Sequence, residues 1–246
     1  MNEDEWLTGT DFTAHARYAA EHLSPRRQRL LAVGFCRAAG SRLEHPDLTA
    51  ALDVIERYAD GHVQAFVVER ARQACRAVAS ELYNSYSAAI DAGAAADAAP
   101  LLAGSELAWA VSFAANSPLP LEMVGARVLS AVVQARTGAV ELIPAPTAEF
   151  SAATAAQHLV MRAVVCEVAG NPFRLTAFSP EWRTDTARAL AEQMYESRDF
   201  GAMPILADAL QDAGCDDEQA LAHCRRDAVG AHVRGCWVCD LVLGKE

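Results

Sequence analysis

Aromatic residues are scarce in this 246-residue chain: Phe, Trp and Tyr make up 7% of it, although 52% of its residues are hydrophobic. Alanine, valine and leucine supply most of the hydrophobic share. Alanine costs no side-chain entropy in a helix and lets neighbouring helices approach closely. The composition therefore favours closely packed helices, and the chain is long enough to bury a substantial core.

Long apolar runs are also missing, since none approaches the ~20 residues that a membrane-spanning helix needs. The opening MNEDEWLTGTD is acidic, unlike a signal or transit peptide. We therefore expect a cytoplasmic protein without a membrane partner. The net charge of −11 argues against broad nucleic-acid binding, which depends on Lys and Arg contacts to phosphate. Local binding would have to rely on two arginine groups: Arg26, Arg27 and Arg29, and Arg225, Arg226 and Arg234.

Several signatures are absent. The chain has no Gly-rich phosphate loop, no HExxH and no GxSxG. It shows neither the sustained alternation of apolar and polar residues that marks a β-strand nor a fixed repeat. The predicted fold is all-α, with about nine to twelve helices in a bundle or short irregular solenoid and no significant β-sheet.

Apolar residues at helical spacing, with capping residues and Pro or Gly breaks, locate these helices. The predicted ranges are 12–23, 26–43, 47–60, 64–91, 101–116, 121–136, 147–169, 184–197, 203–210, 217–226 and 232–243. The segment 93–100 is predicted as a break between helices. Residues 1–170 are expected to form an alanine-rich helical body. Residues 171–246 are expected to form a C-terminal module of short helices on its end, or to continue the same domain.

The C-terminal module concentrates cysteine and histidine. Seven cysteines without an export signal predict free thiols, and buried cysteine is commonly a small hydrophobic residue. Zinc prefers these ligand types. His232, Cys236 and Cys239 are spaced i, i+4 and i+7, so one helix face could present all three. The candidate metal ligands, for zinc or another ion, are Cys215, His223, Cys224, His232, Cys236 and Cys239.

Two alternatives compete with the metal site. A catalytic thiol would be Cys224 or Cys236, with His223 or His232 as its base and Asp208 or Asp240 orienting the base. In the favoured alternative the cluster is structural, and Arg225, Arg226 and Arg234 pair with Asp208, Asp212, Asp227 and Asp240. No residue is assigned as catalytic. The predicted polar or binding cluster comprises Asp208, Cys215, His223, Arg225, His232, Arg234, Cys236, Trp237 and Asp240.

The strings MPILADAL, DAGC, HCR, HVRGCW and DLVLGK, from Met203 to Lys245, carry a resemblance. They resemble the C-terminal signature of a family of bacterial helical proteins that has no assigned activity. Cys239 departs from this signature, in which an aliphatic residue is typical. Because Arg, His and Trp are common at protein interfaces, we expect a non-enzymatic interaction or regulatory protein that binds another protein. The alternatives are a metal-binding protein and a Cys/His-centred enzyme. Whether a small molecule binds is unknown from the sequence.

Overall fold

The computed structural model describes residues 1–40, 45–140, 147–174, 176–226 and 232–245, and these ranges contain helices and no strands. The all-α prediction is therefore confirmed. A short 3-10 helix, η2, spans Pro180–Trp182. The α-helices are α1 (Glu3–Thr8), α2 (Phe12–His22), α3 (Pro25–Arg37), α4 (Pro46–Ala59), α5 (Ala65–Asp91), α6 (Ala95–Ala114), α7 (Leu121–Thr137), α8 (Ala148–Ala169), α9 (Asp185–Ser197), α10 (Met203–Asp212), α11 (Glu218–Arg225) and α12 (Trp237–Leu243).

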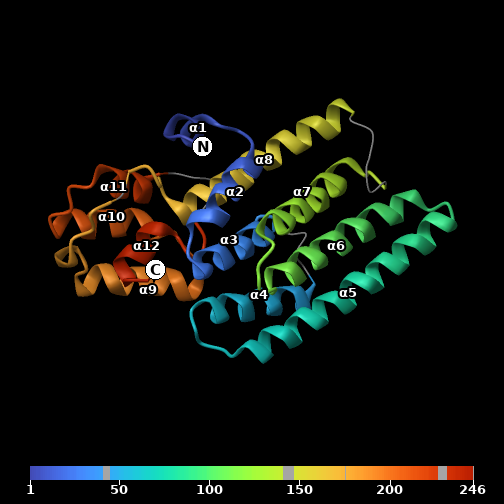
Figure 1. Ribbon diagram of the computed structural model, residues 1–246, viewed down its shortest axis with the longest axis horizontal. Helices are drawn as coiled ribbons and strands as arrows, with labels where there is room; N and C mark the ends of the chain where they lie inside the picture. The colour runs from blue at the N-terminus through green and yellow to red at the C-terminus, as the bar shows by residue number, and fades with distance from the viewer. Residues whose placement is uncertain (41–44, 141–146, 175, 227–231, 246) are drawn as a thin grey trace.

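Helix α3 lies in the middle of the molecule, between α8 and the α4–α7 helices (Figure 1). Ser24 caps it by accepting a hydrogen bond from Arg27 N at 3.3 Å, and Pro25 occupies its first turn. Its side chains from Arg29 to Cys36 are buried. Gly34 allows α8 to approach, because a Cβ there would lie 2.7 Å from Val164 Cγ1. The sequence of α3 thus suits a central helix surrounded on all sides.

The remaining helices of the body pack in chain order. α4 packs on α5, α5 on α6, α6 on α7 and α7 on α8, while α2 lies against α7 and α8. Their buried side chains form one hydrophobic cluster that runs from Trp6 to Val168. Helices α5 and α6 form the long antiparallel pair at the edge of the molecule (Figure 1). This body presents the ends of α3 and α8, together with α4, to the C-terminal helices.

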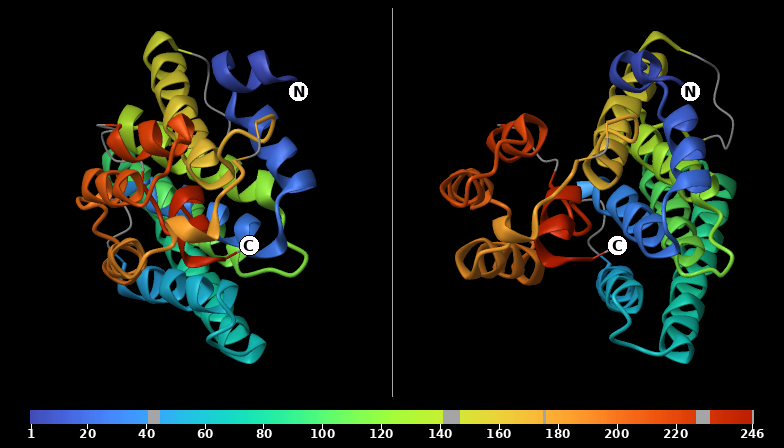
Figure 2. Two further views of the ribbon diagram at one scale, coloured as in Figure 1. Left: turned by 90° about the vertical axis from the view of Figure 1, so that its left-hand side faces the viewer. Right: turned by 60° about the vertical axis from the view of Figure 1, so that its left-hand side comes forward.

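The C-terminal helices bury a second hydrophobic cluster, from Ala187 to Val242. Helix α10 packs on α9 and α11, and α12 packs on α9, α11 and α8. Figure 2 shows α9–α12 beside the body, with α12 between α9 and α8. The division of the chain at residue 170 stays a prediction, but the two clusters meet along the polar face described below.

Three predicted boundaries are wrong. The segment 93–100 is not a break, because α6 begins at Ala95 and contains Pro100; burial of Ala98 and Ala99 outweighs the lost backbone hydrogen bond. The helix predicted to reach residue 43 ends at Arg37. The helix predicted from residue 232 begins at Trp237. Gly235 has φ +95° and a Cβ there would lie 3.0 Å from two side-chain atoms of Leu30, so the chain before α12 is not helical.

Candidate metal site

Four side chains with metal-binding chemistry meet between α8 and the C-terminal helices. They are Glu167, His223, His232 and Cys236, and one ligand atom from each lies within 4.8 Å of the others. His223 Nε2 is 3.4 Å from Glu167 Oε1 and 3.2 Å from Cys236 Sγ. His232 Nδ1 is 2.7 Å from the same Glu167 oxygen. Glu167 and Cys236 are fully buried, His223 is 7% exposed, and His232 is partly buried.

Each of these side chains comes from a different local setting. Glu167 lies in the last turn of α8, His223 in the last turn of α11, and His232 in the segment before α12, of which Cys236 is the N-cap. Gly170 ends α8 at φ +68°, and a Cβ there would lie 3.2 Å from two ring atoms of Trp237. A glycine is therefore needed for α12 to lie against the end of α8.

A hydrogen-bond network orders the cluster. Trp237 Nε1 donates to His223 Nδ1 at 3.1 Å, and an Arg226 nitrogen lies 3.2 Å from the same atom. The indole nitrogen is only a donor. We assign the ring proton of His223 to Nε2, because a proton on Nδ1 would face two N–H groups. His223 Nε2–H then points at Glu167 and Cys236.

The electrostatics of the cluster favour an ionised carboxylate. Burial would raise the pKa of Glu167, but hydrogen bonds from His223 and His232 outweigh it and hold that pKa at about 2. Burial opposes a charge on His223, whereas Cys236 and Glu167 raise its pKa to about 9. The two donors facing Nδ1 oppose that second proton. Burial raises the pKa of the Cys236 thiol, so without a cation the thiol keeps its proton.

The structure brings three of the six predicted metal ligands together and places the other three elsewhere. His223, His232 and Cys236 lie together, but Cys239 Sγ faces Met203 Sδ at 3.7 Å. Cys215 and Cys224 belong to the hydrophobic cluster of the C-terminal helices. The proposed single helix face is wrong, because His232 lies before α12.

Glu167 was missed by the sequence reasoning. It is separated from His223 and His232 by more than 50 residues of the chain, so no local motif contains it. One signal could have drawn attention to it. Glu167 stands on the inward face of α8 between Val164 and Val168, where an acid needs a buried partner.

The members of the larger predicted polar cluster lie in four places. His223, His232, Cys236 and Trp237 are in the candidate metal site, while Cys215 packs in the hydrophobic cluster. Arg225 pairs with Asp208 at 3.4 Å on the surface, as predicted. Arg234 and Asp240 face the body instead, and Arg226 lies 3.5 Å from Glu167. Asp227 lies outside the described residues. The prediction that all of these residues lie together is therefore wrong.

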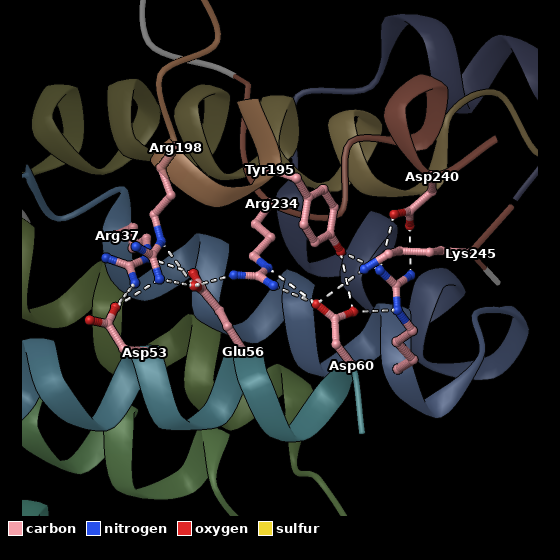
Figure 3. A network of polar contacts seen from close by, with 10 residues as sticks. Arg37, Asp53, Glu56, Asp60, Tyr195, Arg198, Arg234, Asp240 and Lys245 are labelled. Carbon is pink, nitrogen blue, oxygen red and sulfur yellow. Dashed lines mark hydrogen bonds and ion pairs between the residues drawn. The ribbon is translucent and has the colours of Figure 1, made fainter. Parts of the chain in front are cut away.

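Arg234 and Asp240 belong to an ionic network along α4 (Figure 3). Asp53 and Glu56 of α4, and Asp60 at its end, are spaced so that they share one face. Arg198 of the C-terminal helices reaches Asp53 at 2.9 Å and Glu56, and Arg234 reaches Asp60 at 2.7 Å. The module is thus joined to the body by buried or half-buried ion pairs.

The body contributes cations to the same network. Arg37 donates to Asp53 and Glu56 at 2.8 Å each. Arg26 donates to Asp60 at 2.9 Å and to both oxygens of Asp240, at 2.7 and 3.0 Å. Burial would raise the pKa of Asp60, but Arg26, Arg234 and Lys245 outweigh it and hold the pKa below its usual range. The Asp60 carboxyl is therefore held in its ionised form within the network.

The arginines at the start of α3 make contacts within the protein. Arg26 is half-buried in the ionic network, and Arg29 is 8% exposed with its guanidinium 4.8 Å above the ring of Tyr58. Arg29 donates to the Asn116 carbonyl at 2.9 Å. Arg27 lines a cavity that is described below. These arginines therefore serve contacts within the protein, which a charge pattern alone does not distinguish from an exposed face.

The catalytic alternative finds no support in the thiol environments. Cys224 and Cys236 are 1% and 0% exposed, and burial raises the pKa of each. Reactive cysteines are accessible and have a lowered pKa. A substrate could not reach either sulfur without opening the packing around α12.

Comparison with known proteins gives no further assignment, because no family model, curated protein or solved structure matches the chain. The resemblance of its C-terminal strings to a bacterial family stays a prediction, as do the cytoplasmic location and the protein partner. Within the described residues, no helix is both long enough and apolar enough to cross a membrane.

Proposed function

We propose that this protein binds a zinc ion through Glu167, His223, His232 and Cys236. The observation that supports this most is the enclosure of four zinc-type donor atoms within 4.8 Å of one another. Carboxylate, imidazole and thiolate are the protein ligands that zinc takes, usually four in a tetrahedron. The proposal keeps three residues of the set expected from the sequence and adds Glu167.

The spacing of the donor atoms fits such an ion. Ligand atoms about 2.0 to 2.3 Å from zinc in a tetrahedron lie roughly 3.3 to 3.7 Å from each other. His223 Nε2 is 3.4 Å from Glu167 Oε1 and 3.2 Å from Cys236 Sγ, close to those separations. His232 Nδ1, at 2.7 Å from Glu167 Oε1, would have to move by about half an ångström. The two separations from His223 therefore fit the site as they stand, whereas donor atoms as far as 4.8 Å apart would have to approach each other by about 1 Å.

Metal binding would change the protons of the cluster. The ligands must be deprotonated, so Cys236 releases its thiol proton and His223 moves its ring proton from Nε2 to Nδ1. The Trp237 indole N–H, now 3.1 Å from Nδ1, then has to turn away. Trp237 consequently reports occupancy of the site. Four protein ligands leave no open position, which is typical of a structural metal and not of a catalytic one.

The role of this ion would be to hold the C-terminal helices on the body. Glu167 is anchored in α8, whereas the other three ligands come from α11, the segment before α12 and the N-cap of α12. A ligand that binds only the folded state stabilises it in proportion to the logarithm of its concentration over Kd. Zinc would therefore make the docking of the C-terminal helices conditional on metal supply.

The test is elemental analysis of protein purified without an affinity tag. We expect close to one zinc per chain, its loss in Cys236→Ala, and its retention in the matched variant Cys239→Ala. Chelation should lower the melting temperature and shift the fluorescence of Trp237, and added zinc should restore both. Protein that is metal-free as purified, and whose melting temperature does not respond to added zinc, would contradict the proposal.

A further inference from the structure

A cavity of about 310 Å³ lies beside Trp237, where α2 and the start of α3 meet the end of α8 and α12. Ligand-binding cavities begin at about this volume. Its walls include side chains from both the body and the C-terminal helices. It is separate from the candidate metal site, whose four ligands do not line it.

Among the described residues, the charged side chains that line this cavity are Arg27 and Arg174, and no Asp or Glu lines it, although the chain as a whole carries a net charge of −11. His22 lines it as well. Two carboxylates touch these cations from outside the lining: Asp240, 3.7 Å from Arg27 Nε, and Glu3, 2.5 Å from Arg174. The lining is therefore suited to an anion.

Arg27 is the least satisfied of these cations. Its Nε is buried and has no hydrogen-bond partner among the described residues. The Asp240 oxygen that faces it, at 3.7 Å, already accepts from Arg26 at 2.7 Å. A buried guanidinium nitrogen without an acceptor is costly, and a planar guanidinium pairs best with a carboxylate or phosphate. Because Nε itself is enclosed, a ligand in the cavity would pair with the accessible part of the Arg27 side chain, which is 21% exposed.

The rest of the cavity is apolar. Trp237 and Leu241 of α12 line it together with Leu23, and the Tyr18 ring stacks on His22 with centroids 3.9 Å apart. Such walls favour a flat apolar body over a small hydrated ion. An anionic group at one end and an aromatic or aliphatic body are the two features that this lining would recognise.

We propose that the cavity binds a small organic carboxylate, with its carboxylate on Arg27 and its apolar body between Trp237 and Tyr18. Arg174 adds a second cation at the rim, where its side chain is 61% exposed. The proposal does not depend on zinc. Because Trp237 also contacts His223, however, a ligand that moves Trp237 would also alter the surroundings of His223 in the metal site.

The test is a titration of the full-length protein, by ligand-observed NMR and calorimetry, with benzoate and phenylacetate. Benzamide is the neutral counterpart of benzoate, and phenyl phosphate and inorganic phosphate test the phosphate alternative. We expect saturable binding of a carboxylate and at least tenfold weaker binding of benzamide, since charge-assisted hydrogen bonds are the strong ones. No binding of either carboxylate up to about 10 mM would overturn the proposal, as would tighter binding of inorganic phosphate.

Variants locate the binding site. Arg27→Gln should weaken carboxylate binding at least tenfold, and Arg174→Gln, at an exposed position that does not endanger folding, by a smaller factor. Arg188→Gln, on the exposed face of α9, is the matched control and should bind as the unmodified protein does. Circular dichroism checks that each variant is folded. Unchanged affinity in folded Arg27→Gln, or in Arg174→Gln if Arg27→Gln does not fold, would overturn the assignment.

Discussion

Asp60 is the position at which the joint between body and C-terminal helices is most easily broken. Its carboxylate is 1% exposed and accepts from Arg26 at 2.9 Å and from Arg234 at 2.7 Å, with Lys245 Nζ 3.6 Å away. Substituting Asp60→Ala removes the carboxylate that these three cations share. Arg26 keeps Asp240, whereas Arg234 keeps only a 3.9 Å approach to Glu56. The change therefore leaves Arg234 buried without a close counter-charge.

The expected loss is large. Removing one partner of a buried ion pair costs about 3 to 5 kcal/mol, because the remaining charge stays desolvated. For a chain of this length each kcal/mol lowers the melting temperature by about 2 to 4 °C, so Asp60→Ala should melt roughly 6 to 20 °C lower. The matched control is Asp208→Ala, whose carboxylate is 74% exposed and pairs with Arg225 at 3.4 Å. Exposed pairs contribute about 0 to 1 kcal/mol.

Thermal unfolding at neutral pH, followed by circular dichroism and calorimetry, measures the difference between these variants. A loss confined to the C-terminal helices would appear as a separate early transition, monitored by Trp237 and Trp182 on that side of the molecule. Equal melting temperatures for Asp60→Ala and Asp208→Ala would refute the reasoning, because the buried network would then contribute no more than a surface pair.

Three further outcomes follow from other features. The folded pKa of Asp60 lies below its unfolded value of about 3.9, so the stability that Asp60 contributes is complete above that pH and is lost as the pH falls through the folded pKa. The free energy of unfolding of Asp60→Ala, measured against pH in acid, should therefore lack this part of the decrease. Gly34→Ala places a Cβ 2.7 Å from Val164 Cγ1 and should cost about 1 to 3 kcal/mol in urea unfolding, whereas little change would mean that α3 and α8 are not tightly packed. Of the seven cysteines, all free, Cys224 and Cys236 should react with a thiol reagent only after denaturation, and rapid native labelling of Cys236 would show that the cluster opens.

Local signals placed most of the helices correctly. Asp11 and Ser24 cap α2 and α3 from the positions just before Phe12 and Pro25, and such capping residues can be read from the sequence because capping chemistry acts within a few residues. The stripes of α4, α5, α7 and α8 located these helices to within a residue or two at each end. Helix type and approximate bounds depend on local periodicity and were therefore predictable.

Long-range partners were not predictable in the same way. Glu167 joins His232 across 65 residues, and Asp60 joins Arg234 across 174. The start of α12 was misplaced because His232 and Arg234, in the segment before it, contact those distant acids and are not part of a helix. Gly235 was the local sign of this, because it stood in the first turn of the predicted helix and its φ of +95° is unfavourable for other residues.

The long span of the ionic network has a consequence for synthesis of the chain. Asp60 is translated 174 residues before Arg234, and Arg26 is made 214 residues before Asp240. At about 5 to 20 residues per second, the body waits roughly 9 to 35 s for Arg234 to be made. Throughout that interval the carboxylates on the face of α4 have Arg26 and Arg37 of the body as partners but lack Arg234. The surface that the C-terminal helices later cover is therefore charged while the chain is being made, which opposes hydrophobic association at that surface.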